Sequence, residues 1–116
     1  MQPVPQPSSQ SLDDLYAKLL DDLHRAFLAA NTPAAKAEID GASTIVADAL
    51  TALNGADLSA RDAAFAAART KVASANERLE TLQQQISSMV SKVSTADAIV
   101  SDVTNVILAA GKIFKP

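Results

Sequence analysis

The chain has 116 residues, of which 48% are hydrophobic and 3% aromatic, and its net charge at pH 7 is −3. This length suits a single domain with one core. The absence of cysteine excludes disulfides and thiol chemistry, and the absence of a dense Lys/Arg cluster argues against a nucleic-acid partner. Abundant alanine and only three glycines predict an all-α fold.

The first ten residues alternate proline with other residues, at Pro3, Pro5 and Pro7. Proline removes backbone donors and the segment has little to bury, so residues 1–10 are predicted to be a disordered Pro-rich tail and residues 11–116 a single helical-bundle domain. The tail lacks the basic and apolar regions of a secretory signal, and no apolar run reaches about 18 residues. The default expectation is a cytoplasmic protein, with signal-less export left open.

Two short helices are expected after this tail, at about residues 12–30 and 33–53. Both segments repeat apolar residues at helical spacing. Ser11 is the expected N-cap of the first helix, while Thr32 and Pro33 suit the cap and first position of the second. Because so short a connection leaves the two helices side by side, the sequence predicts an antiparallel hairpin.

A third, longer helix is expected at about residues 60–114, because a heptad pattern runs through it without interruption. Every a and d position from Phe65 to Phe114 is apolar. These positions are Phe65, Ala68, Val72, Ala75, Leu79, Leu82, Ile86, Met89, Val93, Ala96, Val100, Val103, Ile107, Ala110 and Phe114. The pattern predicts one helical seam that faces another helix.

A helix of this length would extend well beyond the hairpin. Its C-terminal half is also the more apolar, with Ile99, Val106 and Ile113 at g positions. Either the helix breaks near Ser94 and completes a four-helix up-down bundle, or it stays continuous in a three-helix protein and buries its end in an oligomer. Because no glycine or proline interrupts residues 60–110, the continuous helix and the oligomer are favoured.

Residues that carry catalytic or metal chemistry are scarce. His24 is the only histidine and follows Asp21 by three residues. A metal site in a helical bundle needs two such acid-x-x-His pairs, and the sequence has no histidine for a second pair. The acidic pairs at residues 13–14 and 21–22 are interpreted as a solvated helix face. The sequence therefore predicts no enzyme, no catalytic or cofactor-binding residues, no metal, no cofactor and no small-molecule substrate.

The resulting functional prediction is a non-enzymatic helical interaction or assembly protein. It would act through coiled-coil-like packing of its C-terminal seam with copies of itself or with a partner helix. The predicted interface residues are Val93, Ala96, Ile99, Val100, Val103, Val106, Ile107, Ala110, Ile113 and Phe114. The alternative is an amphipathic protein that uses the same helix to coat a membrane or an apolar granule, which is less favoured because few Lys or Arg and no Trp flank it.

Overall fold

A computed structural model describes residues 9–56, 60 and 62–114, and over this part of the chain the protein is all-helical and compact. Its four helices there are α1 (Ser9–Leu28), α2 (Pro33–Asn54), α3 (Ala63–Met89) and α4 (Val93–Ile113). The predicted tail lies outside the described residues as far as residue 8. Residues 9 and 10 already belong to α1, so the first helix begins earlier than its predicted cap at Ser11 and ends two residues earlier than expected.

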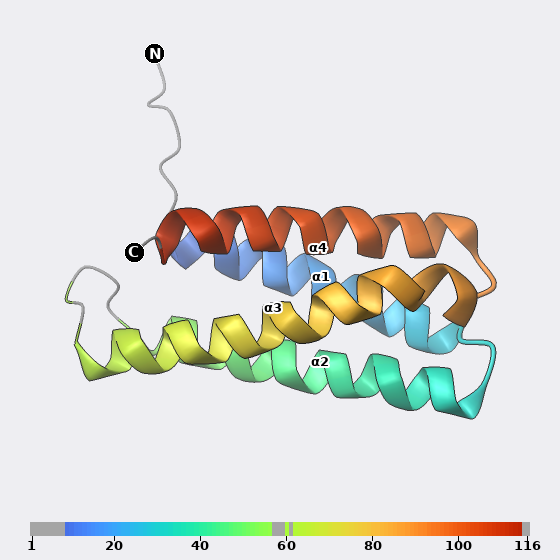
Figure 1. Ribbon diagram of the computed structural model, residues 1–116, viewed down its shortest axis with the longest axis horizontal. Helices are drawn as coiled ribbons and strands as arrows, with labels where there is room; N and C mark the ends of the chain where they lie inside the picture. Colours follow the sequence, from blue (N-terminus) through green and yellow to red (C-terminus); the bar gives the residue numbers. More distant parts are fainter. Residues whose placement is uncertain (1–8, 57–59, 61, 115–116) are drawn as a thin grey trace, which may run out of the picture.

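The four helices lie side by side and run alternately in opposite directions (Figure 1). Helix α1 packs against α2 and α4, and α3 packs against the same two helices. The connections α1–α2 and α3–α4 lie together at one end of the bundle, while the start of α1 and the end of α4 meet at the other (Figure 1). Each helix therefore has two neighbours and one outward side.

The core of the first three helices follows the predicted apolar spacing. On α3 the buried side chains are the a and d residues from Phe65 to Met89. From Ala68 onward they meet α1 residues such as Leu19 and Leu23 and α2 residues such as Ile39 in one hydrophobic cluster. Burial of such side chains supplies about 1.5–3 kcal/mol each, which makes this cluster the main source of stability.

Charge on α3 also matches its position beside α2. Lys71 donates to Asp48 at 2.6 Å, and Arg78 lies 3.6 Å from Glu38. Both cations occupy g positions of the predicted heptads, where they border the core. These two cations of α3 therefore face acidic residues of α2.

The predicted continuous helix over 60–114 is wrong, because the chain reverses after Met89 and starts a new helix at Val93. The break lies just before Ser94, which was the predicted alternative. Val90 caps α3 in an extended conformation with φ −124° and ψ 148°, which a β-branched residue adopts readily. Lys92 precedes α4 and, among the described residues, makes no side-chain capping bond.

The reversal is held by backbone contacts with the connection between α1 and α2. Asn31 N–H donates to Met89 O at 2.8 Å, and Ser91 N–H donates to Ala29 O at 3.2 Å. These bonds form an isolated antiparallel bridge between Ala30 and Val90. The backbone N–H and C=O groups that lack a helical partner beyond the ends of α1 and α3 therefore bond to one another. This pairing removes the free-energy cost of leaving them without hydrogen bonds.

Candidate interaction surface

The predicted C-terminal seam divides into two parts in the structure. Half of its residues fill the core of the protein itself, where they are not accessible to a partner. These residues are Ala96, Ile99, Val103, Val106 and Ala110. The buried face of α4 consists of heptad d and g positions, whereas the sequence predicted a and d positions. The reason is that α4 is rotated about its own axis relative to a straight continuation of α3.

The rotation moves the a positions of α4 to the edge of the bundle. Val93 is 75% exposed and Val100 37% exposed, whereas Ile107 and Phe114 are partly buried. These four residues, each seven positions after the last, are called the α4 stripe below. Leu108, which is 60% exposed, extends the apolar surface beside Ile107, while Ile113 is partly buried and packs against the core.

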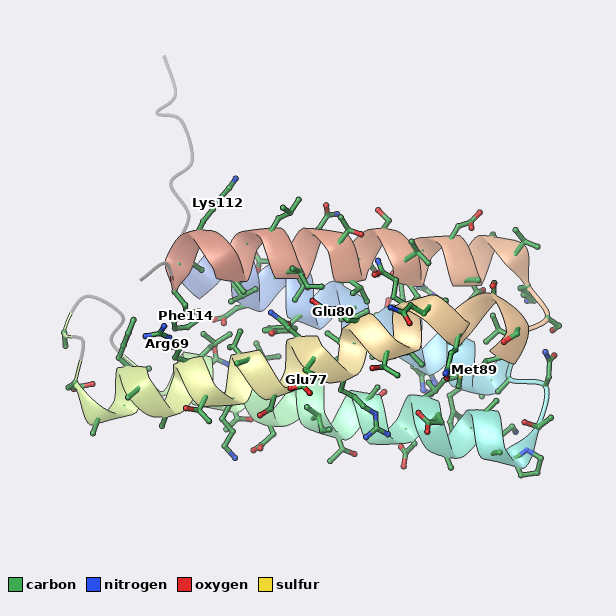
Figure 2. All side chains as sticks on the ribbon, in the orientation of Figure 1. Arg69, Glu77, Glu80, Met89, Lys112 and Phe114 are labelled. Carbon is green, nitrogen blue, oxygen red and sulfur yellow. The ribbon has the colours of Figure 1, made fainter. Side chains whose placement is uncertain are left out.

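The α4 stripe lies on the side of α4 that faces α3. Gln83 of α3 donates from Nε2 to Val100 O and to Thr104 Oγ1, both at 2.9 Å. At the far end, the rings of Phe65 and Phe114 have centroids 5.4 Å apart. Figure 2 shows Phe114 near Arg69, between the ends of α3 and α4. The stripe is thus positioned by two helices and not by α4 alone.

A shallow hollow of about 640 Å³ adjoins this end of the stripe. Its lining comes from one face of α3 and from the residue that caps it. The lining residues are Asp62, Phe65, Ala66, Arg69, Thr70, Ala73, Ser74 and Glu77. Its small side chains leave the helix surface open, so another helix could approach it closely.

A second polar group lies where α1 meets α4. Lys18 donates from Nζ to Asp102 Oδ1 at 2.7 Å and to Asp22 Oδ2 at 3.4 Å. Arg25 donates from Nη1 to Asp22 Oδ1 at 2.8 Å. Asp22 is 6% exposed and Asp102 3% exposed, and within the described part of the chain Oδ2 of Asp102 has no hydrogen-bond donor.

The two carboxyl groups influence each other's protonation. Burial and a hydrogen bond with Asp22 raise the pKa of Asp102 to about 6. The same hydrogen bond, together with Lys18 and Arg25, lowers the pKa of Asp22. A proton on Asp102 would satisfy the orphaned Oδ2 and bind the two helices together, so this pair is best described as a structural link between α1 and α4.

The carboxyl pair does not resemble a metal centre. Over the described residues, no group of three or more His, Cys, Asp or Glu side chains is placed to hold a metal ion. His24 is exposed, and Asp21 beside it pairs with Arg25 at 3.1 Å. The interpretation of residues 21–22 as wholly solvated is wrong for Asp22, which faces α4.

Comparisons with family models, curated proteins and solved structures find no match for this chain. Its candidate sites are therefore judged by their geometry alone.

One further property of α4 bears on the candidate surface. Among the described residues, Val93–Ile113 is the one helix long and apolar enough to cross a membrane by length and composition. Core helices of soluble proteins pass the same criterion, but only 33% of the relevant window is buried here. Much of this weakly charged helix thus faces outward.

Sequence reasoning missed the pairing of Asp22 with Asp102. The sequence held a signal for the burial of Asp102. This residue follows Ile99 by three residues and precedes Val106 by four, so it shares a helix face with these two g positions. Those g positions form part of the core only after the chain reverses. The extrapolated a and d register instead placed Asp102 on the outside.

Proposed function

We propose that this protein is a non-enzymatic helical interaction module that binds a helix along the α4 stripe. The observation that carries the proposal is the heptad spacing of apolar residues at the surface, with Val93 75% and Val100 37% exposed. Apolar side chains that line up at the surface in this way are a common feature of interaction sites. A helix that presents apolar residues at the same spacing would cover them by knobs-into-holes packing.

The environment of the stripe supports a helix as its ligand. Val100 and Thr104 lie beside the α3 residue Gln83, so a docked helix would contact two helices at once. The hollow along α3 has alanine, serine and threonine in its lining, which permits close approach of a backbone. The surface is long and narrow, as a helix requires, and differs from the enclosed pockets that hold small molecules.

The proposal is tested by titrating ¹⁵N-labelled protein with a designed amphipathic peptide that carries leucine at a and d positions. The control peptide has the same composition with its leucines scattered around the helix. We expect amide shifts along the α4 stripe and around Gln83 with the first peptide alone. Val100→Asp should abolish them, whereas Asn105→Asp, which adds the same charge on the outer face of α4, should not. Shifts elsewhere, or none at all, would refute the proposal.

A second candidate function is an amphipathic coat for a membrane or an apolar granule. The length and apolar composition of α4 favour it, together with the fraction of that helix left outside the core. Flotation with phospholipid vesicles separates the candidates. Binding that is lost in the double variant Val100→Asp/Ile107→Asp, with helix content retained, would favour the coat, whereas wild-type protein that never floats would exclude it for that lipid composition.

A further inference from the structure

Helices α3 and α4 contact each other through the same heptad positions. Phe65 and Phe114 are both a positions, and their ring centroids lie 5.4 Å apart. Gln83 and Thr104 are both e positions, and Gln83 Nε2 donates to Thr104 Oγ1 at 2.9 Å. The contact therefore pairs the a and e face of α3 with the a and e face of α4, in antiparallel directions.

This register runs unchanged through the connection between the two helices, residues 90–92. Three residues outside a helix uncouple the rotation of α3 from that of α4, so the monomer does not require a common register. Val90 and Val93 nevertheless fall at e and a positions, and they carry the apolar face through the connection. The d position is also buried in every heptad on both sides of it. These d residues are Ala68, Ala75, Leu82, Met89, Ala96, Val103 and Ala110.

Nothing in the sequence of the connection opposes a helix. Val90, Ser91 and Lys92 all enter helices, and neither glycine nor proline is among them. In the monomer Val90 has ψ 148° and Lys92 has ψ 116°, both of which are extended values. A change of backbone angles over three residues would join α3 and α4 into one helix with a continuous a and e face.

The bonds that hold the reversal have replacements in such a helix. Met89 O, which accepts from Asn31 N–H in the monomer, would accept from Val93 N–H four residues later. Ser91 N–H, which now donates to Ala29 O, would donate to the carbonyl four residues before it. Ala29 and Asn31 are at least partly exposed, so water can take the places that are left.

Two apolar side chains beside the connection lack cover in the monomer. Val93, the first residue of α4, is 75% exposed, and Leu28, the last residue of α1, is 67% exposed. Both helix ends lie at the end of the bundle where the α1–α2 and α3–α4 connections meet (Figure 1). An assembly that joins two bundles at this end would cover both side chains.

We propose that residues 90–92 are a hinge through which two copies of this chain exchange α4. In the exchanged dimer α3 and α4 of each copy form one helix, and the two long helices pair antiparallel about a two-fold axis at the hinge. Helix α4 of each copy then packs against α1 and α3 of the other copy, through the contacts that it makes in the monomer. Near the axis, Val93 of one copy faces Val90 of the other.

Refolding at two concentrations tests the exchange. The full chain is unfolded in urea and refolded at about 1 μM and at about 1 mM, and its mass is measured by light scattering behind a sizing column. We expect 12.0 kDa at the low concentration and a fraction of twice that mass at the high one. The isolated dimer should revert slowly after dilution, because α4 must leave a hydrophobic core before it can return. Wild-type protein that refolds only as a monomer at both concentrations would overturn the proposal.

A proline at the start of α4 separates the two states. Val93→Pro suits the monomer, because proline is favoured at the first position of a helix and the extended Lys92 fits the residue before it. The same proline would interrupt a continuous helix in both copies, so the dimerisation constant should fall by at least about a hundredfold. Val93→Ala is the control, since it removes the same side chain and permits the helix. Equal dimer fractions in the two variants would contradict the hinge.

A pair of cysteines shows whether α4 has changed places. The chain has no cysteine of its own, and in Gln83→Cys/Thr104→Cys the two thiols lie across the contact between α3 and α4. A short bis-maleimide should link them within one chain in the monomer and between chains in the dimer, as a denaturing gel shows. Asp48→Cys/Lys71→Cys, across α2 and α3, should link within one chain in both. A dimer in which the first pair also links within one chain would show that α4 is not exchanged.

The exchange and the interaction module fail separately. A protein that refolds only as a monomer but binds the amphipathic peptide through Val100 overturns the exchange and leaves the module standing. A protein that exchanges α4 but does not respond to the peptide overturns the module alone.

Discussion

The ammonium of Lys18 on α1 lies 2.7 Å from Oδ1 of Asp102 on α4 and 3.4 Å from Oδ2 of Asp22 on its own helix. It therefore bridges two buried carboxyl groups. The first and last helices are joined at this point by charge and by hydrogen bonding as well as by apolar contact. Such a pair makes the stability of the bundle depend on pH.

The direction of this dependence follows from the two pKa shifts. The pKa of Asp102 is raised from 3.8 to about 6, so its contribution is fully present below pH 3.8 and is lost as the pH rises through 6. The pKa of Asp22 is lowered, so its contribution is present above pH 3.8 and is lost at lower pH. We expect the unfolding free energy to be greatest near pH 4 and to fall between about pH 4 and pH 6. Urea unfolding at a series of pH values measures it.

Asp102→Asn should remove the decline between about pH 4 and pH 6. The amide can accept from Lys18 and donate to Asp22, so it imitates the protonated acid at every pH. At pH 7 the variant should be more stable than wild type by about 1–3 kcal/mol, and below about pH 4 the two should be equal. Asp97→Asn, at an exposed position of the same helix, is the control and should leave the profile unchanged. A variant less stable than wild type at every pH would show that the carboxylate itself is needed.

Lys18→Met should raise the pKa of Asp102 further. The ammonium lowers that pKa through its hydrogen bond and its charge, while burial and Asp22 raise it. The side-chain ¹³C carboxyl resonance of Asp102, followed by NMR titration, reports the change directly. Lys71→Met removes a cation that pairs with Asp48 between α2 and α3, and should leave this titration unaltered. An unchanged pKa in Lys18→Met would mean that Lys18 does not reach Asp102 in solution.

Tyr16→Phe should lower the unfolding free energy by about 0.5–1.5 kcal/mol. The buried Tyr16 hydroxyl donates to Asn76 Oδ1 at 2.9 Å, which joins the diagonal helices α1 and α3. Asn76→Ala and the double variant complete a thermodynamic cycle measured by urea unfolding. We expect the double variant to be less destabilised than the sum of the single variants, because each removes the same bond. Additive effects would argue against this hydrogen bond.

Gly111→Ala and Gly41→Ala should both stabilise the protein, the first by about 0.5–1 kcal/mol. A Cβ at Gly111 meets nothing within 4 Å, whereas one at Gly41 would lie 2.8 Å from Nη2 of Arg78. That guanidinium must move away from Glu38, so the gain at Gly41 should be the smaller. Thermal unfolding of both variants checks the order. Destabilisation by Gly111→Ala would show that this position needs glycine.

Local sequence patterns predicted much of the fold correctly. Thr32 accepts from Ala35 N–H at 3.0 Å and Pro33 follows it at the start of α2, as expected. Such a cap depends on residues within one helical turn of each other, which is why the sequence reveals it. At α3 the start differs from the prediction, because Asp62 is the cap and accepts from Phe65 N–H at 3.1 Å, so that the helix begins at Ala63, three residues after its predicted start at about residue 60.

By itself, the sequence determined the helical class, the first hairpin and the apolar face of α3, because spacing along a helix fixes which side chains share a face. Only the tertiary structure decided the break at Val90. It depends on backbone bonds to Ala29 and Asn31, about 60 residues earlier, and no glycine or proline marks it. The break rotates α4, takes Ile99 and Asp102 into the interior and leaves Val100 at the edge. A heptad pattern specifies apolar positions on a helix, but the neighbours against which that helix packs decide which of those positions are buried.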